Sequence, residues 1–261
     1  MVTKDRVLVQ FVDGPYNLHR LPEFDSVLTL LGLKPADVYS ADIKDPASPF
    51  LYARLTVDQA RAVCKRAVLV RRIFFVWSSG PTLQSLAANT VSAEHELVAK
   101  YVRHGQDGAE AAPELRWKLT VDSFGPRRST QERSDFKKAV LQFPVRPSGD
   151  PVPAGSSVFD EQFVLVEDRR IDDTSAPRQL GQSLNASAAR TDKHLERHFF
   201  FGMVIATGQR GLLAQYDLKK RSFIGPTSTC AELSFVMANQ ALARPGTPIN
   251  LCISAIRGFF R

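Results

Sequence analysis

The stretch FLYARLTVDQARAVCKRAVLVRRIFFVW, residues 50–77, decides the fold class of this chain. Phe50 to Leu55 is apolar and rich in β-forming residues, which predicts a strand. Thr56-Val57-Asp58-Gln59 is a capping-box pattern that opens a helix over Val57 to Arg66. Leu69 to Trp77 is again apolar and predicts a second strand. A strand, a helix and a further strand in so short a span indicate a fold of mixed helix and strand layers.

The sequence before this stretch continues the same alternation. Arg6 to Val12 is β-branched and apolar, and Leu21 to Leu31 carries apolar residues at helical spacing until Gly32 stops the run. If Asp37 to Ile43 supplies a short strand, the order becomes βαββαβ, the ferredoxin-like arrangement. We therefore expect an α+β chain whose residues 1–80 form an N-terminal ferredoxin-like domain.

The sequence after Gly80-Pro81 predicts a second unit. Thr82 to Tyr101 has the apolar spacing of a helix, and Arg116 to Ser123 alternates as a half-buried strand does. The box Ser129-Thr130-Gln131-Glu132 leads a basic helix to Leu141, and the Pro-, Gly- and Ser-rich run Pro144 to Ser157 predicts a loop.

Four further stretches complete this unit. Phe159 to Val166 and Phe199 to Thr207 predict strands, the latter buried on both faces because it is continuously apolar. The polar insertion between them, Glu167 to Arg197, has little apolar content, and we expect much of it to be mobile. Gln215 to Ile224 combines an apparent strand with three consecutive basic residues.

Charge and cysteine content narrow the function. The 34 Lys and Arg against 27 Asp and Glu give a net charge of +7, which favours an anionic partner, nucleic acid ahead of a membrane surface. No apolar run reaches the roughly 18 residues of a membrane span and no signal peptide is evident, so we expect a cytoplasmic protein without membrane contact. Cys64, Cys230 and Cys252 are too far apart for a C-x-x-C metal site, and His194 and His198 lack a third ligand. We predict no metal site.

The strongest constellation is QYDLKKRSFIGPTS, residues 215–228, followed by a helix. The box Thr229-Cys230-Ala231-Glu232 predicts the helix start, and Leu233, Val236 and Met237 would share one face. A helix start offers free backbone N–H groups to an anion or a carboxylate. On residue types alone, a simple connection between two domains is the favoured explanation of the turn, and both alternatives stay open.

The order of several separated motifs resembles the eukaryotic tRNA guanine-N2 methyltransferases that modify guanine 10, which place a THUMP domain before a Rossmann-like catalytic domain. The motifs are HRLPEF at 19–24 with Leu28 to Gly32, SPF at 48–50, IFFVW at 73–77, KKRSFIGPTS at 219–228 and LSFVMAN at 233–239. The resemblance implies residues 1–80 as the ferredoxin-like domain, 81–224 as a helical linker and THUMP domain, and 225–261 as a stub of the methyltransferase domain.

The resemblance also implies roles for residues. The two N-terminal units would hold tRNA, because phosphate neutralisation by basic residues dominates affinity. The candidate RNA-binding residues are Arg127, Arg128, Lys137, Lys138, Lys219, Lys220 and Arg221. Any one of them could instead belong to a solvated face. Pro226, Thr227 and Ser228 match the wall of the family's S-adenosylmethionine pocket.

After Pro245-Gly246 the sequence departs from the family pattern. It lacks the D-P-F-x-G-T-G loop for the methyl donor and the D-P-P-Y or N-P-P-Y motif for the guanine, so we expect no catalytic residue, no methyl donor bound and no methyl transfer by this chain alone. A truncated gene, an altered splice, a frame error or a deliberately shortened chain would each explain the departure. The alternative function is a non-catalytic RNA-binding adaptor that acts through a partner. The resemblance also implies a small zinc-binding activator subunit for the full-length enzyme, but this subunit binds the catalytic domain, so we do not expect it to bind this chain.

Overall fold

The computed structural model describes residues 5–40, 48–89, 115–125, 128–143, 147, 149, 151–153, 156–169, 197–222, 224–225 and 228–246. Its strands are β1 (Asp5–Phe11), β2 (Phe50–Leu55), β3 (Val70–Gly80), β4 (Trp117–Phe124), β5 (Glu161–Asp168) and β6 (His198–Thr207). Its helices are α1 (Arg20–Leu30), α2 (Pro35–Val38), α3 (Val57–Arg66), α4 (Leu83–Ala88), α6 (Thr130–Leu141), α7 (Gly211–Gln215) and α8 (Ala231–Gln240), with single 3₁₀ turns η1 (Asn17–His19) and η2 (Leu218–Lys220).

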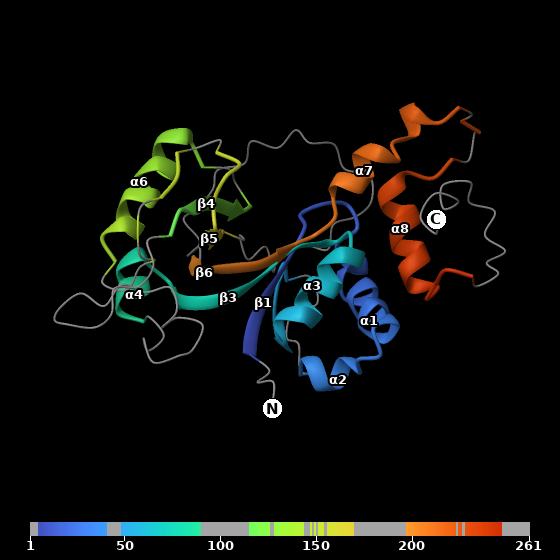
Figure 1. Cartoon of the computed structure of the whole chain (residues 1–261), viewed down its shortest axis with the longest axis horizontal. Coiled ribbons are helices and arrows are strands. Elements are labelled where there is room, and N and C mark those ends of the chain that lie inside the picture. Colours follow the sequence, from blue (N-terminus) through green and yellow to red (C-terminus); the bar gives the residue numbers. More distant parts are fainter. Residues whose placement is uncertain are drawn as a thin grey trace, which may run out of the picture. The chain divides into compact units, whose positions relative to one another are not determined.

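The fold is mixed α/β, and its six strands hydrogen-bond in the order β2-β1-β3-β6-β5-β4 (Figure 1). The chain forms two compact units, of which the first combines residues 1–76 with 203–261 and the second holds residues 77–202. The strands β3 and β6 contribute residues to both units, since the boundaries fall within them.

In the first unit, β1 is the central strand between β2 and β3 and runs antiparallel to both. One face of this sheet packs against α1 and α3, because Val7 and Val9 share a fully buried cluster with Phe24 of α1 and Val63 of α3. The capping box of α3 is present as expected: the Thr56 hydroxyl accepts from the Gln59 backbone N–H, and the Gln59 side chain accepts from the Thr56 backbone N–H. Capping by both groups fixes the strand-to-helix turn that residues 50–66 predict.

One expected strand of this unit is wrong in its described part. Pro35 to Val38 form the short helix α2, with proline at its first position, and Val38 is buried. Proline fixes φ near the helical value and has no N–H for a strand ladder, which favours this helix start. Residues 41–47 lie outside the described residues. The described elements of residues 5–80 therefore do not include the second strand that the ferredoxin-like order requires.

In the second unit, β4 and β5 are parallel neighbours, with Trp117 opposite Glu161 and Phe124 opposite Asp168. Its core is aromatic: Trp77 lies edge-on to Phe163 at 4.9 Å and to Phe201 at 5.9 Å between ring centroids. The predicted box at Ser129 caps α6, which ends at Leu141 as expected. Residues 90–101 of the expected helix after Thr82, and residues 170–196 of the expected mobile insertion, lie outside the described residues.

Near the end of the described chain, α8 lies beside α1 in the first unit (Figure 1). The expected strand over Gln215 to Ile224 is wrong in its described part, because Gln215 ends α7 and Leu218–Lys220 form the 3₁₀ turn η2. The proposed domain boundaries at residues 80 and 224 stay predictions; the two compact units of the structure run across both of them.

Candidate nucleic-acid interface

Arg128 is held by carboxylates. Its guanidinium donates to Glu167 Oε1 at 2.6 Å and to Glu132 Oε1 at 2.5 Å, and it lies over the ring of Phe136. The Glu167 side chain is buried and that of Arg128 is only 12% exposed. These hydrogen bonds raise the pKa of Arg128 above its usual value. The arrangement ties the start of α6 to the end of β5, so a packing role accounts for Arg128 without RNA.

The other basic candidates of the second unit lie on or before α6. Lys138 is exposed and Lys137 is half-buried, so Lys138 is the more accessible to a phosphate. Arg127 lies outside the described residues.

The basic run of the first unit is presented by η2. The Asp217 side chain accepts from the Lys219 backbone N–H at 2.9 Å and caps this 3₁₀ turn. Lys219 and Lys220 are exposed, whereas Arg221 donates to the Thr229 carbonyl at 3.2 Å. The two lysines remain open to a phosphate and Arg221 is partly committed to the turn before α8.

The start of α8 differs from the expectation. Its N-cap is Cys230 and not Thr229, and no side chain caps the helix. The Tyr16 hydroxyl lies 3.1 Å from Cys230 Sγ, a hydrogen bond that with burial raises the pKa of Tyr16 to about 12. Arg210 pairs with Glu232 at 2.8 Å and also donates to the Val68 carbonyl. The first turn of α8 is thereby attached to residues far away in sequence.

The described part of the turn that was assigned to the methyl donor offers few groups. Pro226 and Thr227 lie outside the described residues. The Ser228 backbone N–H donates to the Gly225 carbonyl at 3.1 Å, and the nearest carboxylate along the chain, Glu232, is paired with Arg210. Of the three residues matched to the S-adenosylmethionine pocket, the structure therefore describes only Ser228, whose backbone N–H is used within the turn.

A buried polar network, which the sequence analysis missed, joins α8 to α1 and α3. The Asn239 amide donates to Glu23 Oε1 at 2.8 Å, and its oxygen accepts from Arg66 Nε at 2.8 Å. The Glu23 carboxylate also accepts from the backbone N–H groups of Val68 and Leu69. Burial is the main cause that raises the pKa of Glu23, against these hydrogen bonds. The sequence signal was available, because Glu23 and Asn239 both lie within the motifs that carry the family resemblance.

The helix face expected from Leu233, Val236 and Met237 is only partly correct. Val236 is fully buried, but Met237 is 37% exposed. Phe235, Ala238 and Asn239 are buried in its place. The buried side of α8 cannot be predicted from hydrophobic residues alone, because the polar residue Asn239 lies on that side.

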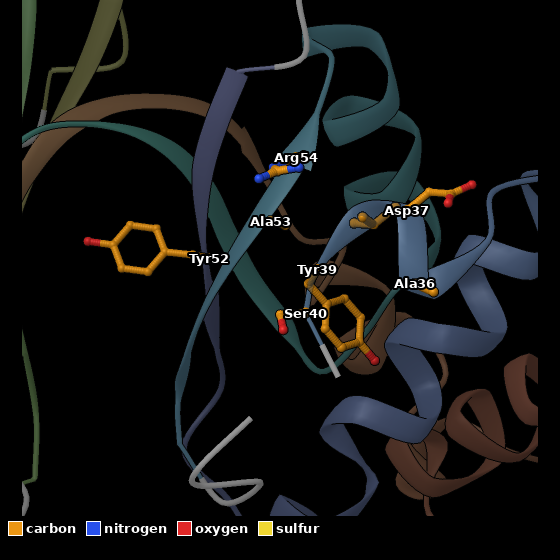
Figure 2. A pocket seen from close by; sticks show the side chains of 8 residues that line it. Ala36, Asp37, Tyr39, Ser40, Tyr52, Ala53 and Arg54 are labelled. Atoms are coloured by element: carbon orange, nitrogen blue, oxygen red, sulfur yellow. The ribbon is translucent and has the colours of Figure 1, made fainter. Parts of the chain in front are cut away.

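A hollow of about 330 Å³ lies between α2 and the strand β2. Figure 2 shows Tyr52 and Tyr39 projecting in different directions from it. The Tyr39 hydroxyl donates to Asp25 Oδ1 at 2.5 Å, and burial raises its pKa. Ser40 lines the hollow, and residues 41–47, which follow it directly, lie outside the described residues. The described lining by itself identifies no ligand.

The described part of the chain contains neither a metal-binding group of side chains nor a membrane-spanning helix. No group of three His, Cys, Asp or Glu side chains is arranged to hold a metal ion there. Nor does any helix described here have the length and apolar character needed to cross a membrane.

Comparison with known proteins gives a consistent match. Residues 5–143 match the family model described as "Tmrp11 THUMP N-terminal domain". The chain is 29% identical over 231 residues to the tRNA (guanine(10)-N(2))-methyltransferase TRMT11 of Xenopus laevis. This alignment covers 87% of the present chain and 41% of the Xenopus protein. The TRMT11 proteins of Mus musculus and Dictyostelium discoideum are 29% and 24% identical over 85% and 92% of this chain.

The chain spans less than half the length of these relatives, 41% to 45%. One solved structure, PH1313 from Pyrococcus horikoshii Ot3, aligns over 78% of this chain and 55% of that chain, with a TM-score of 0.38 and 9% identity. This last likeness is too low to support an inference.

Proposed function

Because this chain belongs to the family of Tmrp11 THUMP N-terminal domains, whose model matches residues 5–143 of its 261, we propose that it is the tRNA-binding portion of a tRNA guanine-N2 methyltransferase. The family match carries the proposal. The relatives named above are tRNA (guanine(10)-N(2))-methyltransferases, and they align over 85% to 92% of the chain. These names favour this function over the adaptor alternative.

The basic residues support the same function. The net charge of +7 suits a polyanion, and the exposed lysines Lys138, Lys219 and Lys220 have no carboxylate partner among the described residues. Cations of this kind bind phosphates without reading the base sequence, so the chain would contact mainly the phosphate backbone of the tRNA. Arg128 would act indirectly, by fixing the start of α6.

Several finer statements remain proposals that rest on the resemblance. They are the ferredoxin-like character of residues 1–80, the identity of α8 as the first helix of a Rossmann-like domain, and Pro226 to Ser228 as a wall of the S-adenosylmethionine pocket. The use of that donor, the zinc-binding activator subunit and a cytoplasmic location belong to the proposed full-length enzyme.

A titration of tRNA binding by fluorescence anisotropy tests the proposal. We expect affinity that falls steeply between 50 and 200 mM salt, by about 10² or more, because several phosphates are neutralised. The double substitution Lys219→Gln and Lys220→Gln should weaken binding, whereas Arg116→Gln should not, since Arg116 is exposed but paired with Asp160 at 3.3 Å. An absence of tRNA binding at 50 mM salt would refute the function.

A further inference from the structure

A basic cluster forms where the helices α3 and α8 end, and we propose that it binds the phosphate backbone of tRNA. The cluster consists of Lys65, Arg66 and Arg244. It lies entirely in the first unit, and the fold brings Arg244 to the end of α3, where Lys65 and Arg66 are neighbours in sequence. The proposal rests on the proposed function and names a surface for it that the basic runs in the sequence do not contain.

Hydrogen bonds at the ends of three helices hold Arg66 and Arg244 in place. Arg66, the last residue of α3, donates through Nη2 to the carbonyl of Ala243 at 2.6 Å. Arg244 donates through Nη2 to the carbonyl of Leu30, the last residue of α1, at 3.3 Å. Because Ala243 and Arg244 are consecutive, these two contacts hold both guanidinium groups close to the same turn. Burial lowers the pKa of Arg66, the buried Glu23 acts against this, and the positive charge of Arg244 lowers the pKa further.

The turn that carries Arg244 is itself well defined. The Ala243 N–H donates to the Ala238 carbonyl at 3.0 Å, which closes the end of α8 in the manner of a Schellman motif. Ala243 is buried, so Arg244 cannot shift far from its position, and its side chain lies at the surface. A preorganised cation loses less conformational entropy when a phosphate binds.

Within the cluster, only Arg66 has a carboxylate near it in the described part of the chain, the buried Glu23, to which it is linked through Asn239. Lys65 and Arg244 are exposed, and neither has a carboxylate within 4 Å among the described residues. The C-terminal ends of helices attract cations, which explains one basic residue at each end. It does not explain why three basic residues lie where the ends of α3 and α8 meet, since like charges placed together repel one another. A polyanion that contacts Lys65 and Arg244 removes this repulsion.

RNA is the polyanion that the rest of the molecule favours. The phosphodiester backbone presents a series of charges a few ångström apart, so one strand can contact both exposed cations. The guanidinium of Arg244 donates one hydrogen bond to the Leu30 carbonyl and has further N–H donors for a phosphate.

The test uses the full chain and tRNA, with Lys65→Gln, Arg244→Gln and their combination. Loss of one phosphate contact lowers the slope of log affinity against log salt by about 0.7 to 0.9, which is roughly five- to eightfold at 0.1 M salt. Each single substitution should show this change, and the double substitution roughly the product. The matched control is Arg61→Gln on the same helix α3, because Arg61 is exposed but lies 3.6 Å from Asp58.

The outcomes separate the cluster from the function. Thermal unfolding checks that each variant is folded before its affinity is compared. If the wild-type protein binds tRNA and the variants bind with the same affinity and salt slope, the proposed role of the cluster is wrong while the proposed function stands. An equal loss for Arg61→Gln would also overturn it, because any surface charge would then have the same effect. If the wild type does not bind tRNA, it is the proposed function that fails.

Discussion

Glu23 and Asn239 are separated by 216 positions in sequence, yet they form the central hydrogen bond of the first unit. Both side chains are fully buried, and Asn239 contacts two charged groups at once, the Glu23 carboxylate and the Arg66 guanidinium. A buried charge is costly unless it has partners, so each of these residues depends on the other two. The family motifs in which Glu23 and Asn239 occur therefore describe one structural site.

We expect Asn239→Ala to lower the free energy of unfolding of the first unit by about 1 to 3 kcal/mol, because Glu23 and Arg66 each lose a buried partner. Urea unfolding followed by circular dichroism measures the loss. The control is Gln240→Ala, whose side chain makes one long contact of 3.4 Å to His19, and which should stay within about 0.5 kcal/mol of wild type. Equal stability of the two variants would contradict the role given to Asn239.

Leu242 has φ of 53°, the left-handed conformation that follows many helices and usually belongs to glycine. A leucine in this conformation is strained, and its side chain is 41% exposed, so little burial is lost on its removal. Leu242→Gly should raise the free energy of unfolding by about 0.5 to 1 kcal/mol. Ala241→Gly, one residue earlier with φ of −76°, should lower it by a similar amount. Destabilisation by both changes would show that the strain is not relieved.

At the scale of elements, α6 is fixed at its first turn by charge. Glu132 accepts from the Ser129 backbone N–H and from Arg128, and these bonds lower its pKa to about 2 from a usual 4.5. A carboxyl group whose pKa is lowered by folding stabilises the fold above its unfolded pKa, and the contribution is lost as pH falls through the folded value. The contribution of Glu132 should therefore be lost between pH 4.5 and pH 2.

Glu132→Gln should remove this part of the pH dependence. We expect the variant to melt below wild type at pH 6 and the difference to shrink toward pH 2, measured by thermal unfolding. Asp135→Asn is the control, since Asp135 lies on the same helix and accepts from the Gln131 amide and not from an arginine. A difference between wild type and Glu132→Gln that is the same at both pH values would contradict the assignment.

At the scale of the whole molecule, the local elements could be predicted and their partners could not. The boundaries of β2 and α3 and the boxes at Thr56 and Ser129 follow from neighbouring residues, so the sequence sufficed. The expected strand at residues 215–224 failed because η2 is set by Asp217 capping its own turn, a signal that apolar spacing does not contain. Partners distant in sequence decide two side chains: Arg128 contacts Glu167, 39 residues away, and Arg66 contacts the carbonyl of Ala243.

The packing of α8 predicts how the chain responds to shortening. A chain that ends at residue 224 loses α8 and leaves Glu23 and Arg66 without Asn239, so its first unit should not fold cooperatively. A chain that ends at residue 246 keeps every contact of α8 described above and should unfold like the full chain. Hydrogen exchange of the backbone amides of α1 measures the difference. Strong protection of α1 in the chain that ends at residue 224 would show that residues 1–224 keep the fold without α8.

The same arrangement sets an order of events during synthesis. Residues 77–202, the second unit, leave the ribosome as one uninterrupted piece and can fold while translation continues. The first unit cannot close its core until α8 has emerged, well over a hundred residues after α1. During that interval Glu23, Val68 and Leu69 lack their final partners on α8, which makes this stage the one at which a chaperone would matter most.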